Sequence, residues 1–508
     1  MIGFIARRLA MAAALLLLLS AIVYFLLALA LDPLEDLYAS SAPNKEELIA
    51  ARIAQLGLDL PWYLRYGDWL AGFIRGDLGV AWQSGQPVTA LLGGAIATSV
   101  QLVFAATCLA LLLGVAIGLV SALRQYSLFD YVLTFVSFVL FALPVFWVAV
   151  LLKQFLAIGV NDYLSDPQLN WLVLLGISVV AGLFWAGALG TTPQRGLMAF
   201  AMAMLSTFGA LTYVLLTGWV HDPQLGTVGV ALVGVAAAFA VTAIFAGLHN
   251  RRALLSALAT AGVGVGAYIG VQWLFFFVEA TVWMLVGLLV VAVLLGLFVG
   301  WLFAGPDRWV SMRGAGVVAL VMSVATYFDR VMQEWQAYSN LSIIRGRPLA
   351  TIGTETPGLG GDFWMSQLDR WTHLLLPTIA LVLISFAQYT RYQRGSMLEV
   401  MGQDYIRSAR AKGVSERVVI VRHALRNALL PLASIVPVDF ITMIGGAVIT
   451  ETIFGWSGMG RLFIVSLKQS EIDPVMAYIM ITGALAMVAN IVADLAYGLL
   501  DPRIRVTS

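Results

Sequence analysis

Long, uninterrupted apolar segments dominate this chain. Runs of about 20 apolar residues, the length of helix that spans a bilayer, recur from Leu9 to Leu499. Hydrocarbon offers no hydrogen-bond partner to an exposed backbone, so only α-helices and closed β-barrels can span it. Barrel strands alternate between polar and apolar side chains, and these runs do not. The sequence therefore predicts an all-α polytopic membrane protein.

Composition and charge narrow the classes of function. Hydrophobic residues make up 61% of the 508 residues and charged residues 11%, against roughly 45–50% and 25% in soluble globular domains. The formal net charge is +1, which predicts no nucleic-acid partner and no other acidic one. The single cysteine, Cys108, excludes an intramolecular disulfide. The histidines are too scattered for metal-ligand spacing, and no metal site is expected: His221, His249, His373 and His423.

The N-terminal segment predicts a membrane span that is retained. Two arginines precede an apolar run over Leu9–Leu31, and at about 23 residues this run exceeds the 7–15 residues of a signal-peptide core. Residues 32–96 are more polar, with eight acidic and four basic residues, and the positive-inside rule places them outside. Asn44 and Glu47 form a capping-box pattern at the start of a short surface helix there. Further core spans are predicted at residues 98–120, 131–156, 374–390, 430–450 and 475–499.

A second hydrophobic block lies between the third and fourth core spans. It contains six apolar runs, near residues 171–190, 198–218, 226–248, 253–276, 281–303 and 314–329. Arginines occur only in alternate short loops of this block, so the positive-inside rule places the loops with Arg195, Arg251 and Arg308 in the cytoplasm. We expect twelve spans with both termini cytoplasmic. The chain then has three parts: core residues 1–157, an inserted block over 158–345, and core residues 346–508.

The most charged stretch of the chain, residues 391–430, follows the fourth core span. Eight basic residues against three acidic ones place it in the cytoplasm. Helix-forming residues on both sides of Gly413 predict two short helices that meet at a bend, because glycine tolerates a positive φ. Small side chains such as Ala409 and Ala411 would then face a groove in a partner. Composition alone favours an ordinary basic cytoplasmic loop over a segment that docks on a partner.

The order of residues in this stretch is similar to a known family. Residues 404–431 resemble the coupling-loop motif of ABC importer permeases, in the version carried by dipeptide and oligopeptide permeases. Further segments agree in order along the chain: Gly57–Pro61, Gly76–Gly79, His373–Pro377, Gly445–Glu451, and Asp494–Tyr497 with Asp501–Arg503. The chain thus resembles the B-type permease subunit over residues 1–157 and 357–508. Such permeases have six spans, so the resemblance implies a six-helix core with about six additional helices inserted between core helices 3 and 4.

The resemblance also implies a mechanism and partners. The chain would form half of a heterodimeric channel in the bacterial inner membrane, with a second, C-type permease subunit. Two cytoplasmic ATPases would close on ATP and pull the bend around Gly413, and an external binding protein would deliver the peptide. The residues that would couple to the ATPases are Asp404, Tyr405, Ala409, Arg410, Ala411, Lys412, Gly413 and Val414.

The residues that follow the lysines indicate that ATP is hydrolysed by another subunit. A phosphate-binding loop requires Lys followed by Ser or Thr. The four lysines of this chain are followed by Glu, Gln, Gly and Gln: Lys45, Lys153, Lys412 and Lys468. We therefore expect a non-catalytic subunit without a cofactor of its own, with ATP and Mg²⁺ on the partner ATPases.

Ionisable residues inside predicted spans are candidates for the translocation pathway. Asp439 lies in the middle of the fifth core span and either lines the pathway or bonds to a neighbouring helix. Gly445, Gly446 and Glu451 belong to a segment that resembles the family motif. Glu451 lies at the outer end of its helix, where a gate, a contact with the binding protein or a structural role is possible.

Other functions stay open from the sequence alone. Related permeases move nickel chelates or oligosaccharides, so the substrate class is not fixed by the resemblance. A twelve-span secondary transporter would have two repeated halves, and no such repeat is found. A membrane-embedded sensor or scaffold would use the inserted block as its recognition surface.

Overall fold

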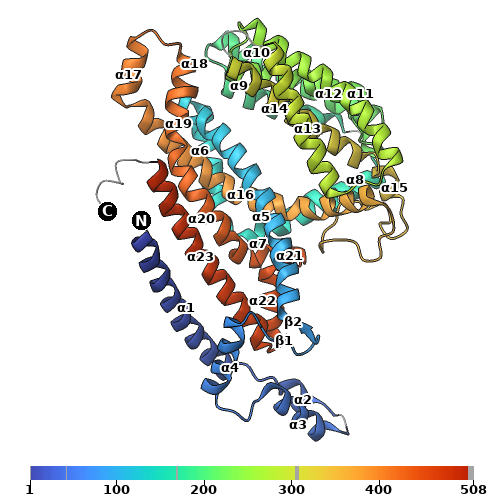
Figure 1. Cartoon of the computed structure of the whole chain (residues 1–508). Coiled ribbons are helices and arrows are strands. Elements are labelled where there is room, and N and C mark those ends of the chain that lie inside the picture. The colour runs from blue at the N-terminus through green and yellow to red at the C-terminus, as the bar shows by residue number, and fades with distance from the viewer. Residues whose placement is uncertain (1, 42, 168–169, 304–307, 501–508) are drawn as a thin grey trace. The chain divides into compact units, whose positions relative to one another are not determined.

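The computed structural model describes residues 2–41, 43–167, 170–303 and 308–500. Helices account for most of these residues, and the only sheet among them is a two-stranded antiparallel ribbon, β1 (Val80–Ala81) and β2 (Gln86–Pro87) (Figure 1). Eleven of the described helices are long and apolar enough to cross a membrane. A twelfth span results when the bent pair Glu416–Ala428 and Leu430–Gly445 counts as one. The predicted all-α polytopic fold is confirmed.

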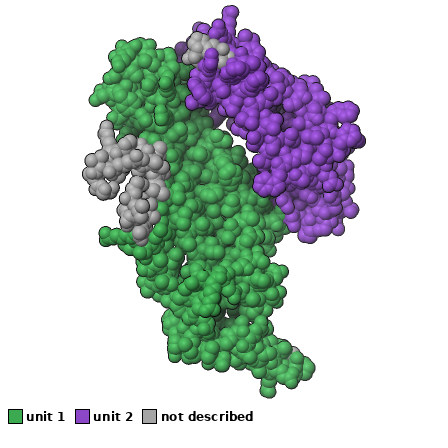
Figure 2. All heavy atoms as spheres, in the orientation of Figure 1, with its two compact units in different colours: residues 1–156, 351–354, 374–508 green, residues 157–350, 355–373 purple. Residues whose placement is uncertain are grey.

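The chain divides into two compact units (Figure 2). Unit 1 comprises residues 1–156, 351–354 and 374–508, and unit 2 comprises residues 157–350 and 355–373. The core segment predicted over residues 346–508 differs from this division, because residues 346–350 and 355–373 belong to unit 2. The latter stretch continues into the membrane helix that follows it. It includes the first turns of the continuous helix α16 (Phe363–Met401), and Trp364 and Leu368 of those turns lie in an apolar cluster of unit 2.

Unit 1 contains the N-terminal and C-terminal helices. Its first part consists of α1 (Ile2–Ala30), α2 (Glu35–Ala39), α3 (Lys45–Leu56), α4 (Trp62–Ile74), the β1–β2 ribbon, α5 (Val88–Leu123), α6 (Leu128–Ala142) and α7 (Val145–Leu151). Its second part consists of the rest of α16, then α17 (Asp404–Ala411), α18 (Glu416–Val418), α19 (Leu425–Ala428), α20 (Leu430–Gly446), α21 (Val448–Phe454), α22 (Met459–Lys468) and α23 (Ile472–Leu500). Two π-helical turns, Leu152–Ile158 and Val419–Ala424, follow α7 and α18.

Small residues let the helices of unit 1 approach closely. A Cβ atom added to Gly114 on α5 would lie 2.7 Å from the Cβ of Tyr389 on α16. One turn later, a Cβ on Gly118 would lie 2.8 Å from the Cβ of Gln393. Helices inside a membrane associate mainly through such close packing, because lipid tails are as apolar as the side chains themselves. The two glycines therefore fix where α5 and α16 touch.

Two local predictions in unit 1 are wrong. The span predicted over residues 131–156 is broken between Ala142 and Val145. Pro144 lacks an N–H and disfavours helical backbone at Leu143, which is extended with ψ of 128°. Asn44 occupies the N-cap position of α3, but its side chain makes no capping hydrogen bond. Its ψ of 27° lies outside the β region typical of a capping residue.

Unit 2 contains the inserted block. It consists of α8 (Gly159–Ser165), α9 (Trp171–Leu189), α10 (Pro193–Leu216), α11 (Gly226–Phe245), α12 (Arg251–Phe277), α13 (Val282–Leu302), α14 (Arg308–Met332) and α15 (Trp335–Ser339), with the start of α16. The six helices from α9 to α14 correspond to the six predicted apolar runs. The tight hairpin expected around Glu279 is present, because α12 ends at Phe277 and α13 begins at Val282.

Capping side chains in the short loops start four helices of unit 2. The side chains of Asn170, Thr192, Asn250 and Thr281 accept hydrogen bonds from backbone N–H groups in the first turns of α9, α10, α12 and α13, at 3.1–3.3 Å. Each bond satisfies an N–H group that has no partner inside its own helix. Loops of a few residues can therefore reverse the chain between consecutive helices.

Asp329 on α14 joins three helices in the interior of unit 2. Its side chain is buried, with 1% of its surface exposed. One carboxylate oxygen accepts from the backbone N–H groups of Leu225 and Gly226 at the start of α11, at 2.5 and 3.1 Å. The other accepts from the Tyr268 hydroxyl on α12, at 2.7 Å, and from the Gln333 amide, at 3.1 Å. Four donors offset the cost of burying the carboxylate.

The loops of unit 2 allow a labelling test of the predicted topology. In a chain whose Cys108 is replaced by alanine, single cysteines at exposed Gln194 and His249 lie in arginine-containing loops. They should resist an impermeant thiol reagent in intact cells, because arginines are retained on the cytoplasmic side. Cysteines at exposed Gln224 and Asn340 should react. Mass shift of the purified protein measures the labelling.

Permeabilised cells provide the control, since every site should react there. His249 is a better labelling site than its neighbour Asn250, because Asn250 caps α12. Asn340 is likewise a better site than Ser339, because the Ser339 hydroxyl is buried. Asp307, in the third arginine-containing loop, lies outside the described residues. Reaction of the His249→Cys variant in intact cells would overturn the predicted orientation of the inserted block.

Candidate functional site

The charged stretch after α16 folds as two short helices around a bend (Figure 1). Helix α16 continues to Met401, eleven residues beyond the end of the span predicted over residues 374–390. Helix α17 then begins at Asp404, α18 begins at Glu416, and Gly413 lies between them. The predicted pair of helices that meet at Gly413 is therefore present in unit 1.

Gly413 supplies a backbone conformation that other residues rarely adopt. Its φ is +75°, in the left-handed region. Its N–H donates to the Arg410 carbonyl at 2.9 Å, and the next N–H, of Val414, donates to the Ala409 carbonyl at 3.3 Å. These bonds close the end of α17. No other atom lies within 4 Å of the position that a Cβ would take, so the bend is set by backbone conformation and not by crowding.

An ion pair bridges the bend. The Arg410 guanidinium on α17 donates two hydrogen bonds to the Glu416 carboxylate on α18, at 2.6 and 3.1 Å. These bonds lower the pKa of Glu416 below its ordinary value and raise the pKa of Arg410. Both side chains are largely exposed, so solvent weakens the attraction. The bidentate geometry nevertheless holds α17 and α18 at a defined angle.

One face of α17 is anchored to the rest of unit 1. Ile406 is fully buried. It lies in an apolar cluster with Met397 of α16 and with Val419, Ala424 and Ala428 beyond the bend. The Tyr405 hydroxyl accepts a hydrogen bond from the side-chain amide of Asn427 on α19, at 2.8 Å. Displacement of α17 would therefore be transmitted to α16 and to the start of α20.

The opposite face of α17 is open. Its exposed residues include Asp404, Arg407, Ser408, Ala411 and Lys412. The prediction that Ala409 faces a partner is wrong, because Ala409 is half-buried and packs against the Ile406 cluster. Residues three apart share one helix face, so Ala409 follows Ile406 inward while Ala411 points away from both. Val414 also packs against this cluster.

A buried ion pair near this segment was missed by the sequence analysis. The Arg394 guanidinium on α16 donates to both carboxylate oxygens of Asp130 on α6, at 2.7 and 2.8 Å. The Ser121 hydroxyl on α5 also donates to Asp130, at 2.5 Å. Asp130 is almost wholly buried. Asp130 and Arg394 each flank an apolar segment, but 264 positions separate them. A local sequence pattern cannot show that residues so far apart are in contact.

Asp439 lies on α20, half-buried, in the interior part of unit 1. The hydroxyl of Tyr389 on α16 is close enough to interact electrostatically with its carboxylate. Gly445 is also half-buried, and its carbonyl accepts a hydrogen bond from the Tyr478 hydroxyl on α23 at 2.5 Å. Gly446 is the last residue of α20. Asp439 and Gly445 therefore lie on the same helix, nearly two turns apart.

Glu451 on α21 is a structural residue in this fold. It has no exposed surface, which places it away from any open pathway. One carboxylate oxygen accepts from the Ser99 hydroxyl of α5 at 2.5 Å. The other accepts from the backbone N–H groups of Gly460 and Arg461 at 2.7 and 3.1 Å. The carboxylate thus caps the N-terminus of α22, which favours negative charge, and ties it to α5 and α21.

A glycine makes room for this cap. A Cβ on Gly458 would lie 2.2 Å from one Glu451 carboxylate oxygen and 2.5 Å from the Ser99 hydroxyl. Any larger residue there would displace the carboxylate. Of the alternatives considered for Glu451, the helix-end role agrees with these contacts, and the pathway role does not.

Comparison with known proteins matches two parts of the chain to one family. Residues 1–103 match the N-terminal model of binding-protein-dependent transport system membrane components. Residues 262–506 match the model "Binding-protein-dependent transport system inner membrane component". The second match begins inside α12, so it extends into the block for which the sequence analysis found no resemblance.

The individual proteins to which this chain is similar are permease proteins, in agreement with the family match. The oligopeptide transport system permease protein OppB of Mycobacterium tuberculosis is 26% identical over 507 residues, covering 100% of both chains. The oligopeptide permease protein AppB of Bacillus subtilis is 45% identical over 154 residues, 30% of this chain and 48% of its own length. The dipeptide permease protein DppB of Escherichia coli is 35% identical over 206 residues, 40% of this chain and 58% of its own. This chain belongs to the family of binding-protein-dependent transport system inner membrane components, and it is a multi-pass permease protein of that family.

Proposed function

We propose that this chain is the B-type permease subunit of an ATP-driven importer of dipeptides or oligopeptides. The names of its relatives support the peptide substrate, since all three are peptide permeases. Its partners would be a C-type permease, two cytoplasmic ATPases and an external binding protein. The observation that carries the proposal is the attachment of α17 to the rest of unit 1 through the cluster around buried Ile406, while its other face is exposed.

Helix α17 would act as the lever between the ATPases and the pathway. Its open residues, among them Ser408, Ala411 and Lys412, would dock on an ATPase groove as the two ATPases close on ATP. Ile406 would transmit the movement, because its cluster joins α17 to α16 and α19. Interiors this closely packed shift as units and do not deform gradually. Bound ATP and Mg²⁺ belong to the partners in this scheme.

The pathway itself would lie along α16 and α20 of unit 1. Asp439 is the ionisable residue on α20, and it is half-buried opposite Tyr389. A carboxylate at this depth is costly unless it meets a partner or water. A passing peptide amino group would supply such a partner. We therefore retain Asp439 and Gly445 as pathway candidates, with Gly446 beside them, and exclude Glu451.

Substitution of Gly413 tests the coupling. Proline cannot adopt a φ of +75° and lacks the N–H that donates to the Arg410 carbonyl. Gly413→Pro should therefore destabilise the bent conformation by about 3 kcal/mol. We expect ATP-driven peptide uptake, measured in reconstituted vesicles with ATP enclosed and the binding protein outside, to fall by roughly tenfold or more. Gly413→Asn is the matched control, because asparagine tolerates the left-handed region and the Cβ position is open. It should retain most of the uptake.

A substitution of Ala411 tests whether the open face of α17 docks on an ATPase. Ala411→Trp places a large side chain on the open face, while Ala411→Ser changes little volume. Only the tryptophan variant should lose uptake, with the chain still inserted in the membrane. Normal uptake by both Gly413→Pro and Ala411→Trp would remove α17 from the coupling mechanism.

Asp439→Asn separates a pathway role from a structural one. If the carboxylate meets the peptide amino group, the variant should raise the KM for peptide uptake, while the yield of solubilised complex stays constant. An N-acetylated peptide, which lacks the amino charge, should be affected less. Reduced yield with an unchanged KM would show that Asp439 only connects helices.

A further inference from the structure

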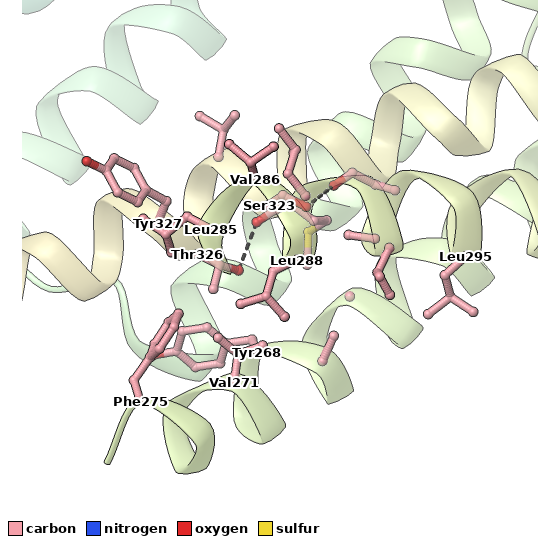
Figure 3. A pocket seen from close by; sticks show the side chains of 18 of the residues that line it. Tyr268, Val271, Phe275, Leu285, Val286, Leu288, Leu295, Ser323, Thr326 and Tyr327 are labelled. Carbon is pink, nitrogen blue, oxygen red and sulfur yellow. Dashed lines mark hydrogen bonds between the residues drawn. The ribbon is translucent and has the colours of Figure 1, made fainter. Parts of the chain in front are cut away.

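Unit 2 contains a deep apolar cavity that the permease mechanism does not use. It has a volume of about 460 Å³ and lies among α12, α13, α14 and the first turns of α16 (Figure 3). Its walls include Val271 of α12, Leu288 and Leu295 of α13, and Met322 of α14. All of these residues belong to unit 2, within the inserted block and the start of α16.

The cavity extends along α13 from a close contact between α13 and α14. At its inner end α13 touches α14, where a Cβ on Gly296 would lie 2.5 Å from the Cβ of Ala319. Lining residues continue along α13 from Leu295 back to Val282, thirteen residues or about 20 Å of helix. This length of helix exceeds the hydrocarbon thickness of one leaflet, about 15 Å, so the lining is long enough for one acyl chain. The positive-inside rule places the Val282 end toward the outer side.

The hydroxyl groups of the cavity wall are already engaged. The hydroxyls of Thr260, Ser323 and Thr326 each donate to the carbonyl four residues earlier on their own helices, at 2.8–2.9 Å. Two of these bonds are drawn in Figure 3. The Tyr268 hydroxyl donates to Asp329. The hydroxyls of the wall therefore need no hydrogen bond from an occupant. The cavity favours an occupant that is apolar along its length.

Polar groups gather at the outer end. The Tyr327 hydroxyl accepts from the Trp371 indole at 3.0 Å and donates to the Gln367 side-chain carbonyl at 3.3 Å. Gln367 lines the cavity, and its amide nitrogen can donate to an ester or headgroup oxygen there. Aromatic rings of Phe275, Tyr327 and Trp364 surround this end. Tyr and Trp characteristically occupy the membrane–water interface.

We propose that this cavity binds one acyl chain of an outer-leaflet phospholipid, with the ester region at Gln367 and the chain end near Gly296. Three observations together carry the assignment: a lining long enough for one acyl chain, wall hydroxyls that are already hydrogen-bonded, and polar groups at the outer end. A cavity of this size, lined by apolar groups and within a membrane-spanning block, is accessible to lipid tails and unfavourable for water. The assignment does not depend on the proposed transport function.

Photolabelling tests the site. The full chain is placed in nanodiscs with a phosphatidylethanolamine that carries a diazirine at the end of one acyl chain, and labelled peptides are mapped by mass spectrometry. We expect enriched labelling of the lining segments Val263–Val271 and Leu288–Leu295. Ala292→Phe fills the cavity and should reduce this labelling at least several-fold. Val290→Phe is the matched control, because Val290 is exposed on the same helix and does not line the cavity.

The other outcomes overturn the proposal. Equal labelling in the two variants, spread over all lipid-facing helices, would show only contact with bulk lipid. Protection of the segments by a palmitoylated peptide, but not by excess unlabelled phospholipid, would assign the cavity to an acylated substrate instead. Size-exclusion profiles of both variants verify that they fold, and Ala267→Phe on the facing wall of α12 repeats the test independently.

Discussion

The absence of hydrogen-bond partners in hydrocarbon is the constraint on which this structure depends. It forces every spanning segment into a helix whose backbone groups pair internally. It also confines breaks to places where another group replaces the lost partner. Asn170, Thr192, Asn250 and Thr281 do this at the starts of helices in unit 2. The short loops between consecutive spans follow from these caps.

The same constraint explains the donor sets around three of the buried carboxylates. Asp130, Asp329 and Glu451 are each at most 2% exposed, and each accepts several hydrogen bonds. Their donors come from different helices, so each carboxylate fixes a meeting point of elements that lie far apart in sequence. Asp130 and Glu451 do so in unit 1, and Asp329 does so in unit 2. Isolated charges at these positions would be strongly unfavourable, which makes the complete donor sets necessary.

Much of the fold was predictable from the sequence, because its signals are local. Apolar run length gave the number of spans, and Gly413 between two helix-forming segments gave the bend. The break at Pro144 was also a local signal, but the continuous apolar run over residues 131–156 concealed it. The pairing of Asp130 with Arg394 could not be predicted, since it depends on how α5, α6 and α16 pack. Ala409 was misassigned because its face follows from the burial of Ile406, a tertiary contact.

Thiol cross-linking tests most directly whether α17 docks on an ATPase. Ser408 is exposed on the open face of α17, and Ile406 is fully buried on the other. In membranes that contain the whole transporter, a short cross-linker should join a cysteine at Ser408 to an ATPase subunit that carries single cysteines along its docking groove. A cysteine at Ile406 should give no product. Failure of the Ser408→Cys variant to cross-link to any groove position, in complexes that still copurify with the ATPases and transport peptide, would contradict the coupling role of α17.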